Sequence, residues 1–375
     1  MKVRRTMTLA AVAMAVFALL AQLAYASPHE PKDLGSDEWD DLGVLYNYGS
    51  GKVAYWAFES SVTAPSTYRT FPRKLWGSIS GWDGTKITPF LADVTGDAHA
   101  DVISAYTYGA TSTGLLVTPG TSGVSSSSRW WKSTGWASSK TKWTASKRFY
   151  ATGAWNPVAL YNYGNNTSGV WVFRPKAGNT FAPSKIWQSP AGGWSWARSK
   201  IAGGDFNNDG KGDLAILYDY TGNTTGLWLF VSNGSTYTKT RVWLSGAGAW
   251  NWSRSQLYAA DLDDDGTDEL FVPYTRSSNT TFFVFQPTGG GTSATLQNWG
   301  TSVYTFFDDI PMTLADVTHD HRADIVLWGT GDSDYGVSME MLPNLGTSFE
   351  IELMYEVFND SDPAHWNYMK TKLAR

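Results

Sequence analysis

The sequence of 375 residues contains no cysteine, which excludes disulfide bonds and a cysteine nucleophile. A fold without disulfides has to be stabilised by its apolar core, by closure of its own sheets, or by bound metal. Charged residues are also scarce, at 17% of the chain, whereas aromatic residues reach 15% and glycine occurs 37 times. This composition favours a β-rich protein with a large apolar interior.

Positive charge is in short supply as well. Without the three basic residues of the N-terminal segment, 26 Lys and Arg stand against 34 Asp and Glu, a net charge near −8. A balance of this sign argues against nucleic acid or an anionic membrane surface as the partner.

Long apolar runs are absent apart from one at the N-terminus. Lys2, Arg4 and Arg5 precede the apolar stretch 9–23, and Ala24-Tyr25-Ala26 then forms a small-residue cleavage signal. The stretch is short for a membrane span, although an uncleaved anchor remains an alternative. We therefore predict a secretory signal peptide over residues 1–26, a secreted, extracellular mature protein over residues 27–375, and no membrane insertion.

Familiar catalytic motifs are missing too. The chain has no G-x-S-x-G elbow, no H-E-x-x-H and no phosphate-binding glycine loop with its lysine. Four carboxylates outside the acidic loops described below keep a glycosidase-like pair open as an alternative; they are Asp308, Asp309, Asp332 and Asp334.

What the chain does contain is a stretch of alternating oxygen-bearing side chains. Asp205, Asn207 and Asp209 are followed by a glycine and then by Asp213, directly before an apolar, strand-like run. A tight loop of this kind turns its side chains inward on one hard cation, and Ca²⁺ best accepts such a set of oxygens. An EF-hand is excluded because Ile216, not glutamate, stands at its twelfth position.

The loop recurs at a near-constant period, which predicts a repeat architecture. We expect side-chain ligands at positions 1, 3, 5 and 9 and a backbone carbonyl at position 7. The predicted ligand sets are Asp205, Asn207, Asp209, Lys211 and Asp213; Asp261, Asp263, Asp265, Thr267 and Glu269; Asp93, Thr95, Asp97, His99 and Asp101; and Asp316, Thr318, Asp320, Arg322 and Asp324.

These loops are not equal. The loops starting at Asp205 and Asp261 carry the most ligands, whereas those starting at Asp93 and Asp316 have threonine at position 3 and lack the glycine after position 5. A first loop with Asp33, Asp37 and Asp41 has Gly35 at position 3, and the third unit, 151–157, has no carboxylate. The sequence therefore predicts two to four structural calcium sites and a metal-free third unit.

Strand-like segments follow each loop in a fixed order. A second strand often ends in Tyr-x-Tyr, a third strand follows a polar turn, and a further strand carries an aromatic residue. These aromatic residues are spaced by 55, 56, 56, 56 and 56 residues, at Trp76, Trp131, Trp187, Trp243, Trp299 and Tyr355. The final strand-like segment, Lys372-Leu373-Ala374, supplies the strand that the first unit lacks. We predict an all-β, six-bladed β-propeller of four-stranded antiparallel blades, its ring closed by the C-terminal strand completing the first blade.

The same residues resemble a known family. The loops Asp205–Asp213 and Asp261–Glu269, each before an apolar strand, and the preceding Ala202-Gly203-Gly204 resemble the FG-GAP/VCBS repeats of integrin-like β-propellers. The resemblance covers nearly all of residues 33–375 and implies a calcium-binding propeller. Similar propellers serve as adhesion heads, as lectins whose sugars sit between blades, and as accessory modules of secreted enzymes.

The 20 tryptophans suggest sugar binding, because flat rings stack on sugar faces. Trp131, Trp187 and Trp243 recur in phase and are predicted to pack between blades. The predicted ligand-binding residues lie just before the loops: Trp82, Trp143, Trp196 and Trp252. Further candidates outside the repeat phase are Trp136, Trp155, Trp194 and Trp250.

Taken together, these features favour a secreted, non-enzymatic binding or adhesion module, monomeric, for an extracellular glycan or a protein surface. The alternative is a carbohydrate-active enzyme, a polysaccharide lyase or glycoside hydrolase on a propeller scaffold. A purely structural surface protein is a third possibility.

Overall fold

The computed structural model describes residues 32–35, 39–64, 67–78, 80–121, 123–150, 154–302, 310–329, 336–351, 355–360, 366–367 and 370–374. The predicted signal peptide, the loop residue Asp37 and the four carboxylates Asp308, Asp309, Asp332 and Asp334 lie outside these residues. No helix within the described part of the chain is long and apolar enough to cross a membrane.

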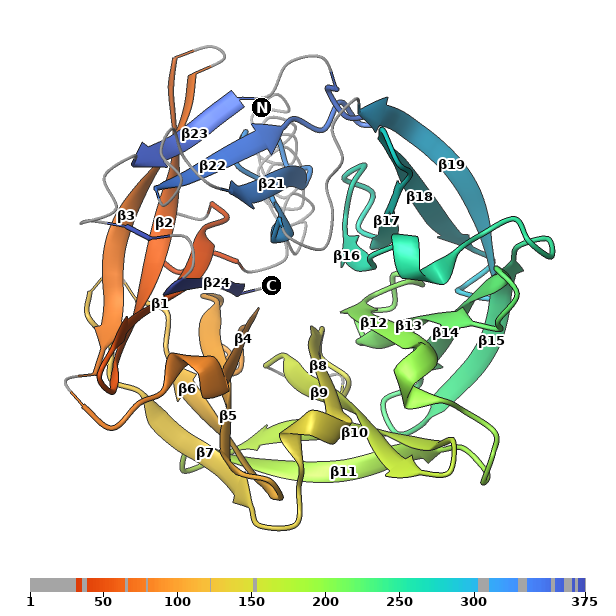
Figure 1. Ribbon diagram of the computed structural model, residues 1–375, viewed down its shortest axis with the longest axis horizontal. Helices are drawn as coiled ribbons and strands as arrows, with labels where there is room; N and C mark the ends of the chain where they lie inside the picture. Colours follow the sequence, from red (N-terminus) through yellow and green to blue (C-terminus); the bar gives the residue numbers. More distant parts are fainter. Residues whose placement is uncertain are drawn as a thin grey trace, which may run out of the picture.

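Six four-stranded antiparallel sheets are arranged as blades around a central axis (Figure 1). Blade one consists, from the axis outward, of β24 (Thr371–Ala374), β1 (Leu42–Gly49), β2 (Lys52–Ala64) and β3 (Thr67–Gly77). The other five blades, in the same inner-to-outer order, are β4 (Ile87–Ala92), β5 (Asp101–Gly109), β6 (Ser112–Thr118) and β7 (Ser128–Ser133); β8 (Thr141–Ser146), β9 (Asn156–Gly164), β10 (Thr167–Lys176) and β11 (Thr180–Gln188); β12 (Ser199–Gly204), β13 (Asp213–Asp219), β14 (Thr225–Ser232) and β15 (Tyr237–Leu244); β16 (Tyr258–Ala260), β17 (Glu269–Thr275), β18 (Thr280–Thr288) and β19 (Ser293–Ser302); and β20 (Met312–Ala315), β21 (Asp324–Gly329), β22 (Val337–Leu342) and β23 (Tyr355–Asp360).

The first and the last described strands pair in blade one. Strand β24 pairs antiparallel with β1, from Gly43 opposite Ala374 to Tyr46 opposite Thr371. Pairing of the last strand with the first covers the inner edge of β1 and closes the ring. The predicted fold and its mode of closure are both confirmed.

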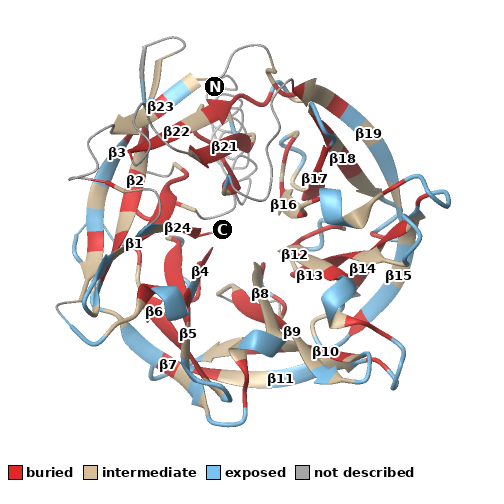
Figure 2. Ribbon diagram, viewed as in Figure 1, coloured by how far each residue is buried: buried red, intermediate tan, exposed pale blue. Residues whose placement is uncertain are grey.

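Both faces of the blades are buried against their neighbours, which explains the near-continuous apolar strands. In β13, Leu214 and Ile216 pack in a cluster with blade three, while Ala215 and Leu217 pack in a cluster with blade five. Figure 2 shows buried residues concentrated in the inner strands and exposed residues on the outer ones. The core therefore consists of apolar clusters between neighbouring blades, arranged in a circle. A strand whose two faces both pack against neighbouring blades cannot alternate apolar with polar residues.

The aromatic ladder is regular only in its first four members. Trp76, Trp131, Trp187 and Trp243 all follow a β-bulge in the outermost strand. In blade five Trp299 occupies the bulge itself, one residue earlier. In blade six the equivalent residue, opposite Met339, is Phe358 and not Tyr355. The prediction for the last two members was wrong, because equal sequence spacing does not report where a bulge falls.

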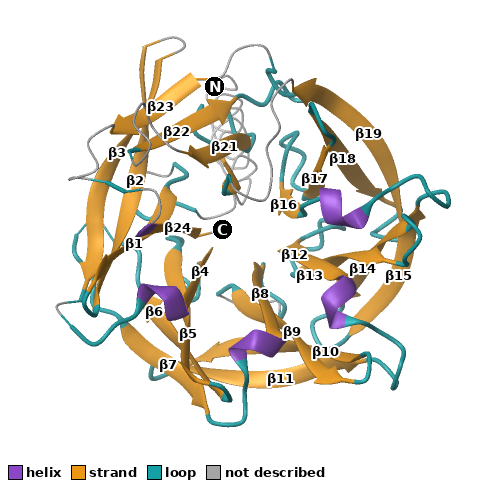
Figure 3. Cartoon of the chain, viewed as in Figure 1, coloured by secondary structure: helices purple, strands orange, loops and turns teal. Residues whose placement is uncertain are grey.

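The two faces of the ring carry different connections. Strands alternate in direction, so the acidic loops between the first and second strands lie on one face, which we call the loop face. The turns after the second strands and the connections between blades lie on the other, which we call the turn face. Single-turn helices stand at four of these inter-blade connections, η1 (Gly84–Lys86), η2 (Ser138–Lys140), η3 (Trp196–Arg198) and η4 (Trp252–Arg254), as Figure 3 shows.

Candidate functional site

The acidic loops share one backbone frame. We number them by blade, so that loops two, four, five and six start at Asp93, Asp205, Asp261 and Asp316. In each, the position-9 carboxylate accepts the N–H of position 2; in loop four Asp213 accepts from Phe206 at 3.1 Å and in loop five Glu269 accepts from Leu262 at 2.8 Å. Positions 4 and 6 both have positive φ, a conformation that favours glycine or asparagine. Where position 6 is not glycine, Ala98 (φ 73°) and His321 (φ 70°) adopt it instead.

Loop five gathers its carboxylates most closely. Oxygen atoms of Asp261, Asp263 and Asp265 lie within 4.8 Å of one another. Asp263 accepts from Gln286 Nε2 at 2.8 Å through Oδ2, while its Oδ1 is buried without a hydrogen-bond partner. Burial raises the pKa of Glu269 to about 9 and that of Asp261 to about 6. Clustered, desolvated carboxylates with an unsatisfied oxygen fit a hard cation such as Ca²⁺.

Loop four has the same frame with one fewer carboxylate. Asp205 accepts from the N–H groups of Asp209 (3.2 Å) and Gly210 (2.8 Å), and Asp213 accepts from Ser232 at 2.7 Å. Burial raises the pKa of Asp213 to about 8. The Lys211 ammonium pairs with Asp209 at 2.7 Å. Asn207 stands at position 3 of this loop.

Loops two and six keep positions 1, 5 and 9 as carboxylates. Burial raises the pKa of Asp101 to about 7, and it raises the pKa of Asp324 well above its ordinary range. Thr95 and Thr318 stand at position 3, and their hydroxyls lie 3.4 and 3.5 Å from the position-1 carboxylates. The position-7 side chains turn to other partners, since His99 contacts Asp33 at 3.3 Å and Arg322 pairs with Asp320 at 2.5 Å.

Loops one and three differ from the other four loops in the residues at their ligand positions. In loop one Asp41 accepts from Leu34 N–H at 2.9 Å and Asp33 from Gly35 N–H at 2.7 Å, so two carboxylates keep the frame. In loop three Asn156 takes the position-9 role and accepts from Phe149 N–H at 2.8 Å. Counting back places Arg148 at position 1 and Tyr150 at position 3. The described residues of this loop offer no carboxylate ligand.

The loops also brace one another around the ring. The N–H at position 8 donates to the position-1 carbonyl of the preceding loop: Ala100 to Asp33 at 2.7 Å, Trp155 to Asp93 at 2.6 Å, Asp268 to Asp205 at 3.0 Å and Ala323 to Asp261 at 3.4 Å. A cation held in one loop would therefore also order the edge of the next blade.

Two of the predicted ligand-binding tryptophans, Trp196 and Trp252, contact other residues of the fold. Trp196 donates its indole N–H to Leu160 O at 2.9 Å and lies under Lys142 Nζ, 4.6 Å from the ring centroid. Trp252 does the same with Leu217 O at 2.8 Å and with Lys200 at 4.3 Å. Both rings thus have partners within the scaffold, and their part in ligand binding stays a prediction.

Trp82 and Trp143 belong to different places. Trp82 packs between Trp76 and Tyr106, with centroid distances of 5.1 and 5.2 Å. Trp136, Trp194 and Trp250 repeat that position between a ladder tryptophan and a tyrosine of the next blade, so they are in phase, contrary to the prediction. Trp143 lies instead inside strand β8 and lines the central cavity, together with Trp155.

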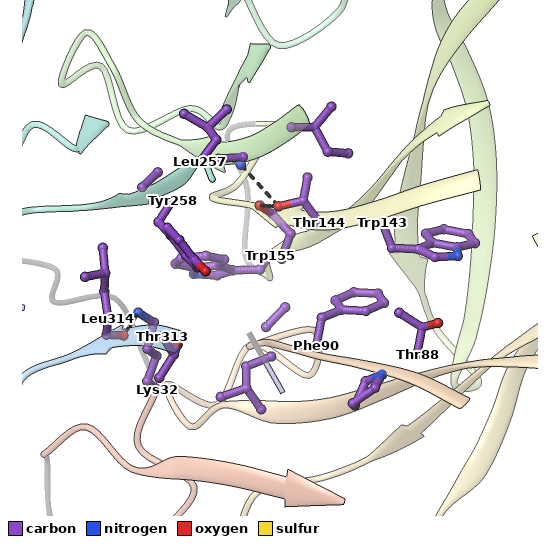
Figure 4. A pocket seen from close by; sticks show the side chains of 18 residues that line it. Lys32, Thr88, Phe90, Trp143, Thr144, Trp155, Leu257, Tyr258, Thr313 and Leu314 are labelled. Carbon is purple, nitrogen blue, oxygen red and sulfur yellow. Dashed lines mark hydrogen bonds between the residues drawn. The ribbon is translucent and has the colours of Figure 1, made fainter. Parts of the chain in front are cut away.

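The central cavity has a volume of about 260 Å³ and is walled by the innermost strands of five blades and Lys32 (Figure 4). Trp155, Tyr258 and Phe90 supply aromatic surface, Thr88 and Thr144 supply hydroxyls, and Lys32 Nζ donates to Leu314 O. No carboxylate is among the described residues of this wall.

A second group of aromatic side chains lies on the turn face. The second tyrosine of each Tyr-x-Tyr pair stands at the end of a second strand, and we call these residues the tyrosine rim: Tyr48, Tyr108, Tyr163 and Tyr220. Tyr48, Tyr108 and Tyr163 are 46%, 39% and 40% exposed. In three blades a cation from the outermost strand lies over the ring: Lys132 at 4.2 Å from Tyr108, Lys185 at 5.4 Å from Tyr163 and Arg241 at 5.8 Å from Tyr220.

Three rings of the tyrosine rim, those of Tyr108, Tyr163 and Tyr220, pack directly against a glycine. A Cβ atom at Gly114, Gly169 or Gly226 would come within 2.9, 2.8 or 2.7 Å of the rings of Tyr108, Tyr163 and Tyr220, respectively. Trp171 and Trp228 donate their indole N–H groups to the hydroxyls of Tyr163 and Tyr220, both at 2.8 Å. The rim is therefore a fixed, repeated feature. The Tyr-x-Tyr motif was visible in the sequence, but its exposure was not.

Comparison with known proteins agrees with this architecture. The family model described as FG-GAP-like repeat matches residues 205–272, which include loops four and five and the strand after each. These residues carry an FG-GAP-like repeat, and the chain is a six-bladed β-propeller. A search of curated proteins gave no match.

Three solved structures resemble the chain at low sequence identity. The Tc holotoxin pore of Photorhabdus luminescens is 15% identical with a TM-score of 0.47, over 83% of this chain and only 14% of that one. AofleA from Arthrobotrys oligospora is 11% identical with a TM-score of 0.48, over 84% of this chain and 86% of that one. The Aleuria aurantia lectin, described as a six-bladed β-propeller that recognises fucose, is 11% identical with a TM-score of 0.47, over 87% and 98%.

Proposed function

We propose that this protein is a secreted, calcium-stabilised β-propeller that binds extracellular glycans without catalysing a reaction, and that the tyrosine rim is its binding surface. The observation that carries the proposal is the repeated pair of a tyrosine and a lysine or arginine on one face of three blades. In two of these pairs the tyrosine, Tyr108 or Tyr163, is about 40% exposed. An aromatic ring offers a flat apolar surface for the C–H groups of a pyranose, and an adjacent cation donates hydrogen bonds to sugar hydroxyls.

Preorganisation supports this assignment. The rings of Tyr108, Tyr163 and Tyr220 each lie against a glycine, and the Tyr163 and Tyr220 hydroxyls each accept an indole N–H. A ring that is already ordered loses little conformational freedom on binding. Repetition around the ring favours a multivalent ligand such as a polysaccharide, because several weak sites add avidity.

Calcium has a supporting part in the proposal. Loops four and five supply the donors, and a cation there would neutralise carboxylates whose desolvation is otherwise unfavourable. The loops lie on the face opposite the rim, so calcium stabilises the ring and does not touch the glycan. Chelation should therefore weaken glycan binding only as far as it loosens the fold.

A glycan array with the intact protein, with and without EDTA, tests the proposal. The double variant Tyr163→Ala/Tyr220→Ala should lose binding by about tenfold or more while its thermal melt stays cooperative. Phe71→Ala is the matched control, since Phe71 is 55% exposed but lies on outer strand β3 and not on the rim. Unchanged binding by the double variant, or no glycan bound in calcium, would refute the proposal.

A further inference from the structure

Loop three has basic and aromatic residues at positions where the acidic loops have carboxylates. In blade five, Gln286 of β18 donates to Asp263 at loop position 3, at 2.8 Å. The residue equivalent to Gln286 in blade three is Arg174 of β10, because the residues two positions earlier occupy the same register. Val172 lies opposite Val158 and Val284 opposite Phe271, each two residues after loop position 9. The position-3 residue is Tyr150, and the Arg174 guanidinium carbon lies 4.7 Å from its ring centroid. A guanidinium on an aromatic ring thus replaces an amide on a carboxylate.

Blade three contains further basic residues besides Arg174. Arg148 stands at position 1, where the five other loops all have aspartate, and it is exposed. Lys176 lies two residues beyond Arg174 and is exposed as well. Among the ion pairs of the described residues, none involves Arg174, Arg148 or Lys176. A position built for a cation in the other blades is here surrounded by cations.

A cavity opens at this place on the loop face. It has a volume of about 470 Å³ and lies between loop two, loop three and the outer strands of blades two and three. Its wall includes Trp130, Tyr150, Arg174, Lys176 and Asn179, with no carboxylate among the described lining residues. Trp130 is only 6% exposed and packs against Phe181 at 5.1 Å, so the apolar side of the cavity is rigid. The volume is within the range of small-ligand sites.

We propose that this cavity is a second binding site, which takes an anionic saccharide unit, with its carboxylate or sulfate on Arg174 and Lys176 and its ring against the aromatic wall. Arginine presents planar, paired donors that match a carboxylate or a sulfate, and its contact with Tyr150 holds it in place. The site lies on the face opposite the tyrosine rim. It does not depend on the rim, and loss of rim binding leaves it unchanged.

Calorimetric titration of the intact protein tests the site with three matched disaccharides: galacturonate-containing, sulfated galactose-containing and neutral galactose-containing. At least one charged probe should bind, and the neutral one at least about tenfold more weakly, because charge-assisted hydrogen bonds are lost. A preference between the two charged probes identifies the anionic group. Equal affinity for neutral and charged probes, or no binding of either charged probe, overturns the proposal.

The variant Arg174→Gln installs the residue that blade five carries at the same position, so the fold should be kept, as a thermal melt would verify. It should weaken the charged probe by about tenfold or more, and Arg174→Lys should recover part of the loss. Arg254→Gln is the control, since Arg254 is exposed in η4 on the turn face. Wild-type affinity in Arg174→Gln overturns the assignment. Double Tyr163→Ala/Tyr220→Ala protein should bind this probe normally, which separates the site from the rim.

Discussion

The ammonium group of Lys147 lies 3.2 Å from Asp268 Oδ1, and the two side chains are only 10% and 0% exposed. Lys147 directly precedes loop three and Asp268 is in loop five, so this ion pair spans blade four. The second carboxylate oxygen of Asp268 accepts the N–H of Asp205, the first residue of loop four, at 2.5 Å. One buried carboxylate therefore ties three consecutive blades together at the loop face.

Removing one partner of this pair should be costly. Lys147→Met leaves the Asp268 carboxylate buried without its cation, and we expect the free energy of unfolding to fall by about 3 to 5 kcal/mol. Denaturant titration measures the change. The control Lys140→Met removes an exposed lysine of η2 and should stay within about 0.5 kcal/mol of wild type. A loss in Lys147→Met no larger than in the control would mean that the pair adds nothing to the ring.

The effect of the Asp263→Asn substitution on stability should differ in sign between EDTA and calcium. Asp263→Asn removes one of three clustered carboxylates, so in EDTA the variant should be as stable as wild type or more stable, because like-charge repulsion is relieved. In calcium it should lose about tenfold in affinity, or about 1.4 kcal/mol of calcium-linked stabilisation. Thermal melts with and without calcium measure both. Asp264→Asn is the control, since Asp264 is exposed and its positive φ of 63° suits asparagine.

The calcium-free protein should become less stable as the pH rises. Burial raises the pKa of Asp101 to about 7, of Asp213 to about 8 and of Glu269 to about 9. An acid with a raised folded-state pKa holds more protons when folded. Its contribution is complete below its unfolded pKa, near 4, and is lost as the pH rises through the folded value.

Melting temperatures in EDTA should therefore fall between about pH 5 and pH 9, and calcium should abolish the fall because the ion takes the place of the protons. The matched measurement repeats the series in excess calcium. A melting temperature in EDTA that rises over this range would contradict the assigned protonation of the loops.

Local repetition explains why the ring could be predicted from sequence. Each acidic loop and the strand after it are contiguous, so their period and their order were readable, as was the closing role of the segment around Leu373. The side chains that we predict as calcium ligands in loops four and five could be listed for the same reason. Pairing between distant residues was not, since Lys147 and Asp268 are 121 positions apart.

The exact position of each strand along the chain was harder to predict than the order of the strands. The segment Trp143 to Lys147 has the same W-x-x-S-K spelling as Trp196 to Lys200, yet the first is an inner strand and the second a single-turn helix followed by a strand. Only the backbone decides between such matches. The cation-lined cavity was equally hidden, because Arg174 and Tyr150 come from separate elements whose contact depends on the β9–β10 register.

Strand β24 should be indispensable for a stable ring. Besides its pairing with β1, it buries Leu373 and Ala374, and its Thr371 hydroxyl accepts the indole N–H of Trp328 in blade six at 2.8 Å. Lys372 donates to the carbonyls of Gly84 (2.9 Å) and Ile87 (2.7 Å) in blade two. Four residues thus connect blades six, one and two.

A chain ending at residue 370 would expose the edge of β1 and unseal two inter-blade clusters, so it should lose its cooperative melt and aggregate. Size-exclusion chromatography and calorimetry measure this, and a synthetic peptide spanning 366–375 should restore folding by strand addition. The point variant Lys372→Gln separates the two contributions, because it keeps the strand and weakens only the contact with blade two; it should cost about 1 to 2 kcal/mol and remain monomeric. A truncated chain that melts cooperatively at the wild-type temperature would show that the ring does not need to be closed.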